Sequence, residues 1–216
     1  MEIRGNLIGL PLVVLNVDPL MPKSPNGSRN SVRIISGEHR SRKIQFPDVP
    51  GLRPTADRIR ETLFNWLRED VAGARCLDLF AGSGALGLEA LSRGASAVSF
   101  IDASSAAIAA IRTALTTLRI DGSSVYHADA QAWIKAQPNT VAPYDIVFLD
   151  PPFAANLLPS VCHLLVDSSL LSPGSKIYLE SATDLSDADL PKSWVKLKSG
   201  KAGAVFFYLL SPVPKE

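Results

Sequence analysis

Four consecutive residues after a short apolar run at 146–149 carry the clearest chemical signal in the chain: Asp150, Pro151, Pro152 and Phe153. Proline has no backbone N–H, so two prolines in a row leave only hydrogen-bond acceptors beside the Asp150 carboxylate. Such acceptors suit the exocyclic amine of a nucleobase, whose lone pair is delocalised into the ring and weakly nucleophilic. Phe153 offers a face on which the base can stack. We interpret this tetrapeptide as a place where an amine is held for reaction; the alternative is a rigid turn at a strand end.

A glycine-rich turn follows another apolar run and opens a helix-like stretch. Its glycines are spaced as in dinucleotide-binding loops, and an acidic residue comes 20 positions after the first of them: Gly82, Gly84, Gly87 and Asp102. Glycine lets the backbone pass close to a ligand because no Cβ intervenes. A carboxylate at the end of the next strand can accept hydrogen bonds from both hydroxyls of a ribose. The pattern predicts a nucleoside-binding loop, with a plain turn at a helix start as the alternative.

Asp78 distinguishes this loop from one that cradles a pyrophosphate. It lies inside the apolar run, four residues before Gly82, where a carboxylate favours a ligand with a positive centre and a free amino group. S-adenosylmethionine has both. The stretch at 78–84, Asp-Leu-Phe-Ala-Gly-Ser-Gly, resembles motif I of class I methyltransferases. The tetrapeptide at 150–153 resembles the (Asp/Asn)-Pro-Pro-(Phe/Tyr) motif of amino-methyltransferases, which act on N6 of adenine, N4 of cytosine or N2 of guanine.

This resemblance implies a set of residues that bind S-adenosylmethionine, with Asp102 at the ribose and Asp129 at the adenine. The whole set is Asp78, Phe80, Ala81, Gly82, Gly84, Asp102 and Asp129. For Asp129 a structural alternative stays open, because aspartate is also a favoured residue at the N-cap of a helix.

Basic residues cluster before this core. Residues 29–60 carry eight basic and three acidic side chains, residues 61–190 seven and fifteen, and residues 191–216 five and one. The net charge is only +1, but this asymmetry favours a polyanionic partner. We expect these residues to contact nucleic-acid phosphates: Arg33, Arg40, Arg42, Lys43, Arg53, Arg58 and Arg60. The alternatives are a solvated basic surface and, for Arg58 and Arg60, internal pairing with Asp57 or Glu61.

Apolar runs alternate with helix-like stretches from residue 73 onward, which is typical of a mostly parallel, doubly wound sheet. We predict strands at 76–80, 97–101, 123–127, 144–149, 175–180, 194–198 and 204–210, the last two forming an antiparallel edge hairpin around 199–201. Upstream, β-prone runs at 32–36 and 42–46 predict a hairpin around Gly37. Thr55 is a favoured N-cap for a following helix that ends at Gly73. The expected fold is α/β and Rossmann-like, a seven-stranded class I methyltransferase sheet with an N-terminal hairpin–helix arm.

The 216 residues suffice for one domain with a small appendage. We expect a disordered extension at 1–31, a basic arm at 32–72, a methyltransferase domain at 73–211 and a tail at 212–216. Two cysteines and three scattered histidines make neither a disulfide framework nor a metal site. No apolar stretch approaches the ~20 residues of a membrane helix. We therefore expect a cytoplasmic protein with two buried cysteines, no metal and no membrane partner.

Several segments together resemble the RsmD family, bacterial methyltransferases that act on the guanine N2 of 16S ribosomal RNA. They are Arg-Ile-Ile-Ser-Gly at 33–37, Arg-Ser-Arg-Lys at 40–43, the run at 51–67 and the motifs at 78–94 and 145–153. The resemblance spans about 32–210. Two positions depart from the family: its usual Arg-Gly-Arg has Ser41 in the middle here, and glutamate is common where this chain has Asp102.

By this resemblance the tetrapeptide holds the guanine amine and S-adenosylmethionine supplies the methyl group. The helix after Thr55 closes over the donor site, and the arginines grip RNA. The implied partner is 16S ribosomal RNA within an assembled or assembling small subunit, bound by a monomeric enzyme. Guanine N2 lies on the minor-groove edge, so the target is a loop base or one extruded from its stack.

Three other functions stay open. An adenine-N6 methyltransferase acting on DNA or RNA would use the same tetrapeptide. An NAD-dependent oxidoreductase would use the glycine loop but leaves the tetrapeptide unexplained. A non-catalytic RNA-binding assembly factor would need neither motif intact.

Overall fold

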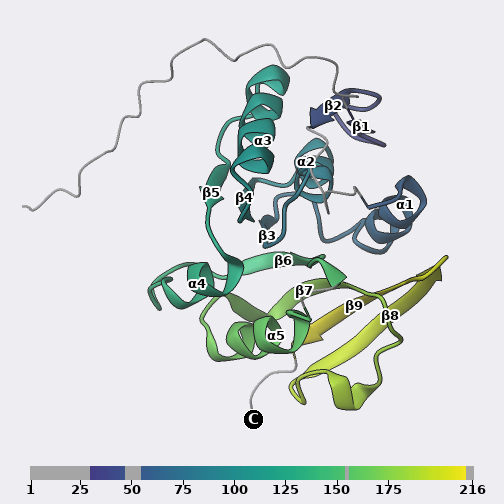
Figure 1. Ribbon diagram of the computed structural model, residues 1–216, viewed down its shortest axis with the longest axis vertical. Helices are drawn as coiled ribbons and strands as arrows, with labels where there is room; N and C mark the ends of the chain where they lie inside the picture. The colour runs from purple at the N-terminus through teal and green to yellow at the C-terminus, as the bar shows by residue number, and fades with distance from the viewer. Residues whose placement is uncertain (1–29, 47–54, 154–155, 213–216) are drawn as a thin grey trace, which may run out of the picture.

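A computed structural model describes residues 30–46, 55–153 and 156–212 (Figure 1). Its centre is a seven-stranded sheet with the order β5-β4-β3-β6-β7-β9-β8. β9 is antiparallel to both of its neighbours, while the five strands from β5 to β7 run parallel. The fold expected from the sequence is confirmed. The strands are β3 (Arg75–Asp78), β4 (Ala97–Asp102), β5 (Ser124–His127), β6 (Tyr144–Leu149), β7 (Leu171–Ser181), β8 (Trp194–Ala202) and β9 (Val205–Pro212).

Helices cover both faces of this sheet (Figure 1). One core cluster joins one face to α1 (Asp57–Trp66), α2 (Ala85–Ser92) and α3 (Ser105–Leu118). A second cluster joins the other face to α4 (Ala130–Lys135) and α5 (Leu158–Asp167). Parallel strands buried on both faces read as continuous apolar runs, which is why the sequence predicted them well. Both cysteines are buried, as expected, and no helix in the described part of the chain is long and apolar enough to cross a membrane.

The N-terminal hairpin consists of β1 (Asn30–Arg33) and β2 (Lys43–Phe46). Its apolar face, with Val32 paired to Ile44, packs into the same core cluster as α1, α2 and α3. The connecting loop lies tightly on the end of α2: a Cβ at Gly37 would lie 1.7 Å from the backbone oxygen of Ser92. The hairpin is therefore joined to the core by direct packing.

Several element boundaries differ from the prediction. α1 begins after Ala56, so Thr55 is not its N-cap, and it ends at Trp66, well before Gly73. β8 ends at Ala202 and β9 begins at Val205. The turn that connects them is therefore shorter than the predicted turn at 199–201 and lies after it. Gly200 stays within the strand because its missing side chain leaves room for the ring of Phe207. The low strand propensity of glycine does not predict this packing between neighbouring strands.

Candidate active site

Acidic side chains gather at the carboxyl ends of four neighbouring strands. Asp78 and Asp102 end β3 and β4, Asp150 follows β6, and Glu180 is near the end of β7. Alternation along each strand turns Asp78, Asp150 and Glu180 toward one face, because Cys76, Phe148 and Tyr178 two positions earlier all belong to the cluster under α1–α3. We call these three residues, Asp78, Asp150 and Glu180, the carboxylate row. In open α/β sheets ligands bind at this edge.

Asp78 is buried, with 2% of its surface exposed. Its Oδ2 accepts a hydrogen bond from the backbone N–H of Gly87 at 3.1 Å. The pKa of Asp78 is raised to about 8, chiefly by burial and in smaller part by the nearby charges of Asp150 and Asp102, while the bond from Gly87 acts in the opposite direction. A buried carboxyl with a raised pKa and acidic neighbours favours a cationic ligand.

The glycine loop has the conformation that its sequence requires. Gly82 and Gly84 have φ values of 52° and 76°, in the left-handed region that favours glycine. Asp102 orders the loop by accepting hydrogen bonds from the N–H groups of Gly82 and Ser104, both at 2.7 Å. Each carboxylate oxygen keeps a second lone pair with which a ribose hydroxyl can bond. Gly87 serves helix–strand packing, since a Cβ there would lie 2.2 Å from the Phe100 ring.

The other predicted donor-binding residues lie around this loop. Phe80 is half-buried and packs against the second core cluster, on the face of α4 and α5. Ala81 is buried, and its N–H donates to the backbone oxygen of Ile101 at 2.9 Å. Asp129 is exposed and caps α4, because its Oδ1 accepts from the N–H of Ala132 at 2.9 Å. The capping role of Asp129 is thus present in the structure, and its adenine contact stays a prediction.

The tetrapeptide combines one buried, two exposed and one partly exposed residue. Pro151 is buried, whereas Pro152 is exposed and Phe153 keeps 43% of its surface accessible. The partly exposed Asp150 accepts a hydrogen bond on Oδ2 from the Thr55 hydroxyl at 3.1 Å. Burial raises the pKa of Asp150 to about 6, and the Thr55 bond opposes this shift. At neutral pH Asp150 is therefore mostly ionised and acts as an acceptor beside an exposed aromatic ring.

Glu180 completes the carboxylate row from β7, and Tyr178 lies beside it on the same strand. Glu180 is 3% exposed and accepts a hydrogen bond from the Tyr178 hydroxyl at 2.7 Å. Burial and the charge of Asp150 raise the pKa of Glu180 to about 8, whereas the hydrogen bonds from Tyr178 and Thr55 lower it. The sequence left Glu180 open between a site residue and a solvated strand end, and it is buried. The role of Thr55 was missed, because the sequence suggested a capping function.

The predicted RNA-contacting residues differ in their exposure to solvent. Five of them are exposed: Arg33, Arg40, Arg42, Lys43 and Arg58. Arg53 lies outside the described residues. The prediction for Arg60 is wrong, because its side chain is 1% exposed and bonded within the protein. Its Nη2 donates to the backbone oxygen of Arg33 at 2.7 Å and to Asp57 at 2.6 Å, and its Nη1 lies 3.7 Å from Glu89.

Glu89, which lies 3.7 Å from Arg60, connects this arginine to further groups. Its carboxylate accepts from the backbone N–H groups of Ile35 and Ser36, at 2.7 and 3.0 Å, and from Arg93 at 2.7 Å. These bonds attach the loop of the hairpin to α2. We call Arg60, Glu89, Asp57 and Arg93 the charge network. It explains why Arg60 is buried: it satisfies groups on β1, α1 and α2 together.

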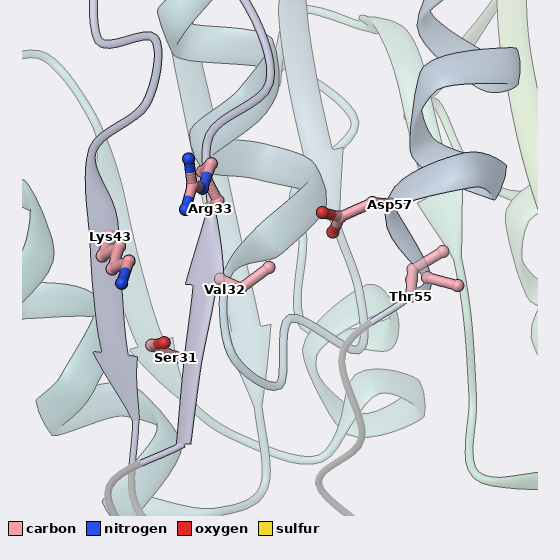
Figure 2. A pocket seen from close by; sticks show the side chains of 7 residues that line it. Ser31, Val32, Arg33, Lys43, Thr55 and Asp57 are labelled. Carbon is pink, nitrogen blue, oxygen red and sulfur yellow. The ribbon is translucent and has the colours of Figure 1, made fainter.

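Two surface hollows lie at different positions relative to the carboxylate row. A hollow of about 350 Å³ lies between the hairpin and the start of α1, and Thr55 is among its lining residues (Figure 2). A hollow of about 690 Å³ lies between the end of α3 and the beginning of β5, lined by Arg112, Arg119 and their neighbours. The second hollow is at the amino end of the strands, away from the row. Among the described residues, no group of histidine, cysteine or acidic side chains could hold a metal ion.

The strand order, the glycine loop and the carboxylate row define a class, the fold of S-adenosylmethionine-dependent methyltransferases. The solved ribosomal protein L11 methylase of Lactobacillus delbrueckii subsp. bulgaricus shares this fold, with a TM-score of 0.56 at 18% identity over 76% of this chain and 83% of that one. The family profile "conserved hypothetical protein 95" matches residues 32–211. The chain belongs to this family, which is the RsmD family that its motifs resemble.

Two individual relatives agree with this family. Ribosomal RNA small subunit methyltransferase D of Escherichia coli strain K12 is 44% identical over 188 residues, which cover 87% of this chain and 93% of the relative. The solved structure of the Escherichia coli protein yhhF has a TM-score of 0.76 and 41% identity, and the match covers 86% of this chain and 100% of that one.

Proposed function

We propose that this protein transfers a methyl group from S-adenosylmethionine to the exocyclic N2 amine of a guanine in 16S ribosomal RNA. The observation that carries the proposal is the position of Asp150, Pro151 and Pro152, an acceptor-only corner beside the glycine loop and within the carboxylate row. The 44% identity to a relative named as a small-subunit ribosomal RNA methyltransferase supports the choice of RNA.

The donor site fits S-adenosylmethionine on electrostatic grounds. In the described part of the chain, no ion pair involves Asp78, Asp150 or Glu180, and burial raises the pKa of all three. A ligand with a sulfonium and an ammonium group supplies the missing positive charge and an activated methyl group. Asp78 and the loop at 80–84 would hold its amino-acid part, and Asp102 would bind its ribose with the free lone pairs of its carboxylate.

The acceptor corner acts on the amine. Ionised Asp150 and the neighbouring backbone carbonyls accept both N–H bonds, which draws electron density onto the nitrogen and fixes the direction of its lone pair. Thr55 and Glu180 are positioning residues: the Thr55 hydroxyl holds Asp150 in place, while buried Glu180 stays neutral and adds no second charge. Transfer would break the bond between the sulfonium sulfur and the methyl carbon, leave S-adenosylhomocysteine as the neutral thioether and place a positive charge on the methylated nitrogen; Asp150 is placed to receive the proton that this nitrogen then releases.

The RNA must present an unstacked guanine. In the part of the chain that the structure describes, Phe153 is one of four large apolar side chains that are exposed. It lies directly after the acceptor corner, where a splayed base can stack on its ring. The exposed basic residues of the hairpin and α1 would contact the neighbouring phosphates. A basic surface of this small size suits a monomer that acts in the cytoplasm on an assembled or assembling small subunit, where protein surfaces add to the contact.

The direct test is to incubate the protein with labelled S-adenosylmethionine and small subunits that lack the modification, then to identify the labelled nucleoside. Label in N2-methylguanosine is expected. Asp150→Ala should abolish it, and Asp167→Ala, an exposed aspartate on α5, serves as the matched control. Label in N6-methyladenosine would replace the proposal with the adenine alternative, and donor binding without label in any RNA or DNA would favour the non-catalytic one.

A further inference from the structure

The hollow between the hairpin and α1 has two distinct walls (Figure 2). Ser31, Arg33 and Lys43 line it from the hairpin, and Thr55 and Asp57 line it from the start of α1. Figure 2 shows the Asp57 side chain directed toward the strands across the gap. Its volume of about 350 Å³ is at the lower end of the usual range for ligand sites.

A buried residue holds the two walls together. The Arg60 guanidinium donates to the backbone oxygen of Arg33 on one wall and to the Asp57 carboxylate on the other. Glu89 is 3.7 Å from the same guanidinium and also binds the backbone that follows β1. These bonds connect the hairpin to the start of α1, and such support pre-organises a binding site between them.

The positive charges at the hollow are not balanced within the protein. Arg33 and Lys43 are directly opposite each other in the β1–β2 register, an arrangement in which like charges destabilise a sheet. Among the described residues, neither side chain forms an ion pair, and the lining carboxylate of Asp57 is bonded to Arg60. Two cations that repel each other over a rigid cavity suit an anion with several acceptor oxygens.

The hollow is directly connected to the carboxylate row. Thr55 lines it, and the hydroxyl of the same residue donates to Asp150 at 3.1 Å. A nucleotide whose amine is held at Asp150 therefore has its sugar–phosphate backbone within reach of this cavity. The other basic loop residues, Arg40 and Arg42, do not line it.

We propose that this hollow binds a backbone phosphate of the RNA next to the nucleotide that is methylated, with Arg33 and Lys43 as its ligands. The inference rests on the proposed function. It goes further because it separates two basic residues with a defined task from the rest of a diffuse basic surface, and because it assigns Arg60 to building the site.

The test compares two variants that each lose two positive charges, Arg33→Gln with Lys43→Gln, and Arg40→Gln with Arg42→Gln. Methylation of small subunits is measured over a range of salt concentrations. For the first pair we expect KM for the subunit to rise roughly 10- to 100-fold and the salt dependence to weaken by about one phosphate contact per residue. The second pair should raise KM several-fold less, and the affinity for the methyl donor should be unchanged in both.

A stability measurement separates a binding role from a structural one. Because Arg33 and Lys43 repel each other, their replacement should leave the Tm equal to or above that of the wild type. Equal rises in KM for the two pairs would overturn the inference and indicate a diffuse electrostatic attraction. A fall in Tm with unchanged KM would overturn it as well. Lys43→Gln alone repeats the test should the double variant not fold. An inactive wild type would instead contradict the proposed function.

Discussion

Two groups of ionisable side chains lie near α1 and α2, each with buried members, and they are built in opposite ways. In the charge network every carboxylate has a cation or several backbone N–H groups, and Glu89 has both. In the carboxylate row, ion pairs with described residues are absent, and the pKa of each member is raised. Paired charges stabilise the folded chain. Acidic groups without a cationic partner repel one another when ionised, and a cationic ligand would lower this repulsion.

The largest expected effect is on catalysis. Asp150→Ala removes the carboxylate that accepts the amine, and we expect turnover to fall by roughly 100-fold or more, since one positioned polar group contributes about this much. The folded state should persist, because no structural ion pair is lost. Turnover near the wild-type rate, measured beside Asp167→Ala, would show that the row does not serve the reaction.

The next effect is on stability. Arg60→Ala leaves Glu89 and Asp57 without this cation, and breaking a buried pair costs about 3–5 kcal/mol in the free energy of unfolding. Denaturant unfolding measures this change. The control is Arg58→Ala, an exposed arginine two positions earlier on α1, for which we expect a change within about 0.5 kcal/mol. Similar values for the two variants would mean that the network does not stabilise the hairpin.

The free energy of unfolding, measured over a range of pH, tests whether Glu180 of the carboxylate row is buried without a cation. The pKa of Glu180 is raised from 4.5 to about 8, so the folded state keeps this proton to a higher pH than the unfolded chain does. The free energy of unfolding should therefore decrease as pH rises from about 4.5 to about 8. Glu180→Gln should flatten this decrease, whereas Glu69→Gln, an exposed control, should not. Parallel curves for wild type and Glu180→Gln would contradict the assignment.

The smallest expected effect is the loss of turnover when the hydrogen bond between Thr55 and Asp150 is removed. Thr55→Val keeps the shape of the side chain but removes the hydrogen bond to Asp150, and a bond of this kind contributes about 1 to 2 kcal/mol. We expect turnover to fall by roughly 5- to 30-fold, with donor affinity unchanged. Thr55→Ser should restore most of it. Equal rates in Thr55→Val and Thr55→Ser would remove Thr55 from the site.

The sequence predicted the sheet and the nucleotide loop because their signals are local. Continuous apolar runs mark strands buried on both faces, and Gly82 and Gly84 have the positive φ values that their residue type permits. Asp150 could be assigned because the two prolines beside it restrict which groups face a ligand. In each case the chemistry is contained within a few consecutive residues.

Contacts between distant residues could not be predicted in this way. Thr55 bonds to a residue 95 positions away, and from its neighbours alone it resembles a helix cap. Arg60 is as basic as exposed Arg58, and only the position of Glu89 on α2 makes it structural. Ser41 has a φ of 68°, in the region that favours glycine, and the sequence alone indicated this position only as a departure from the pattern that the resemblance implied.

The amino-acid sequence by itself thus determined the order of strands and helices, the glycine loop and the acceptor-only corner, since these depend on residue type and short spacing. The tertiary structure decided which charges are paired. A carboxylate or guanidinium is the same chemical group whether or not it has an ion-pair partner. Its partners depend on which strands and helices pack together. Packing turned Arg60 inward, and it left buried Asp78 and Glu180 beside partly exposed Asp150, with no cation paired to them among the described residues.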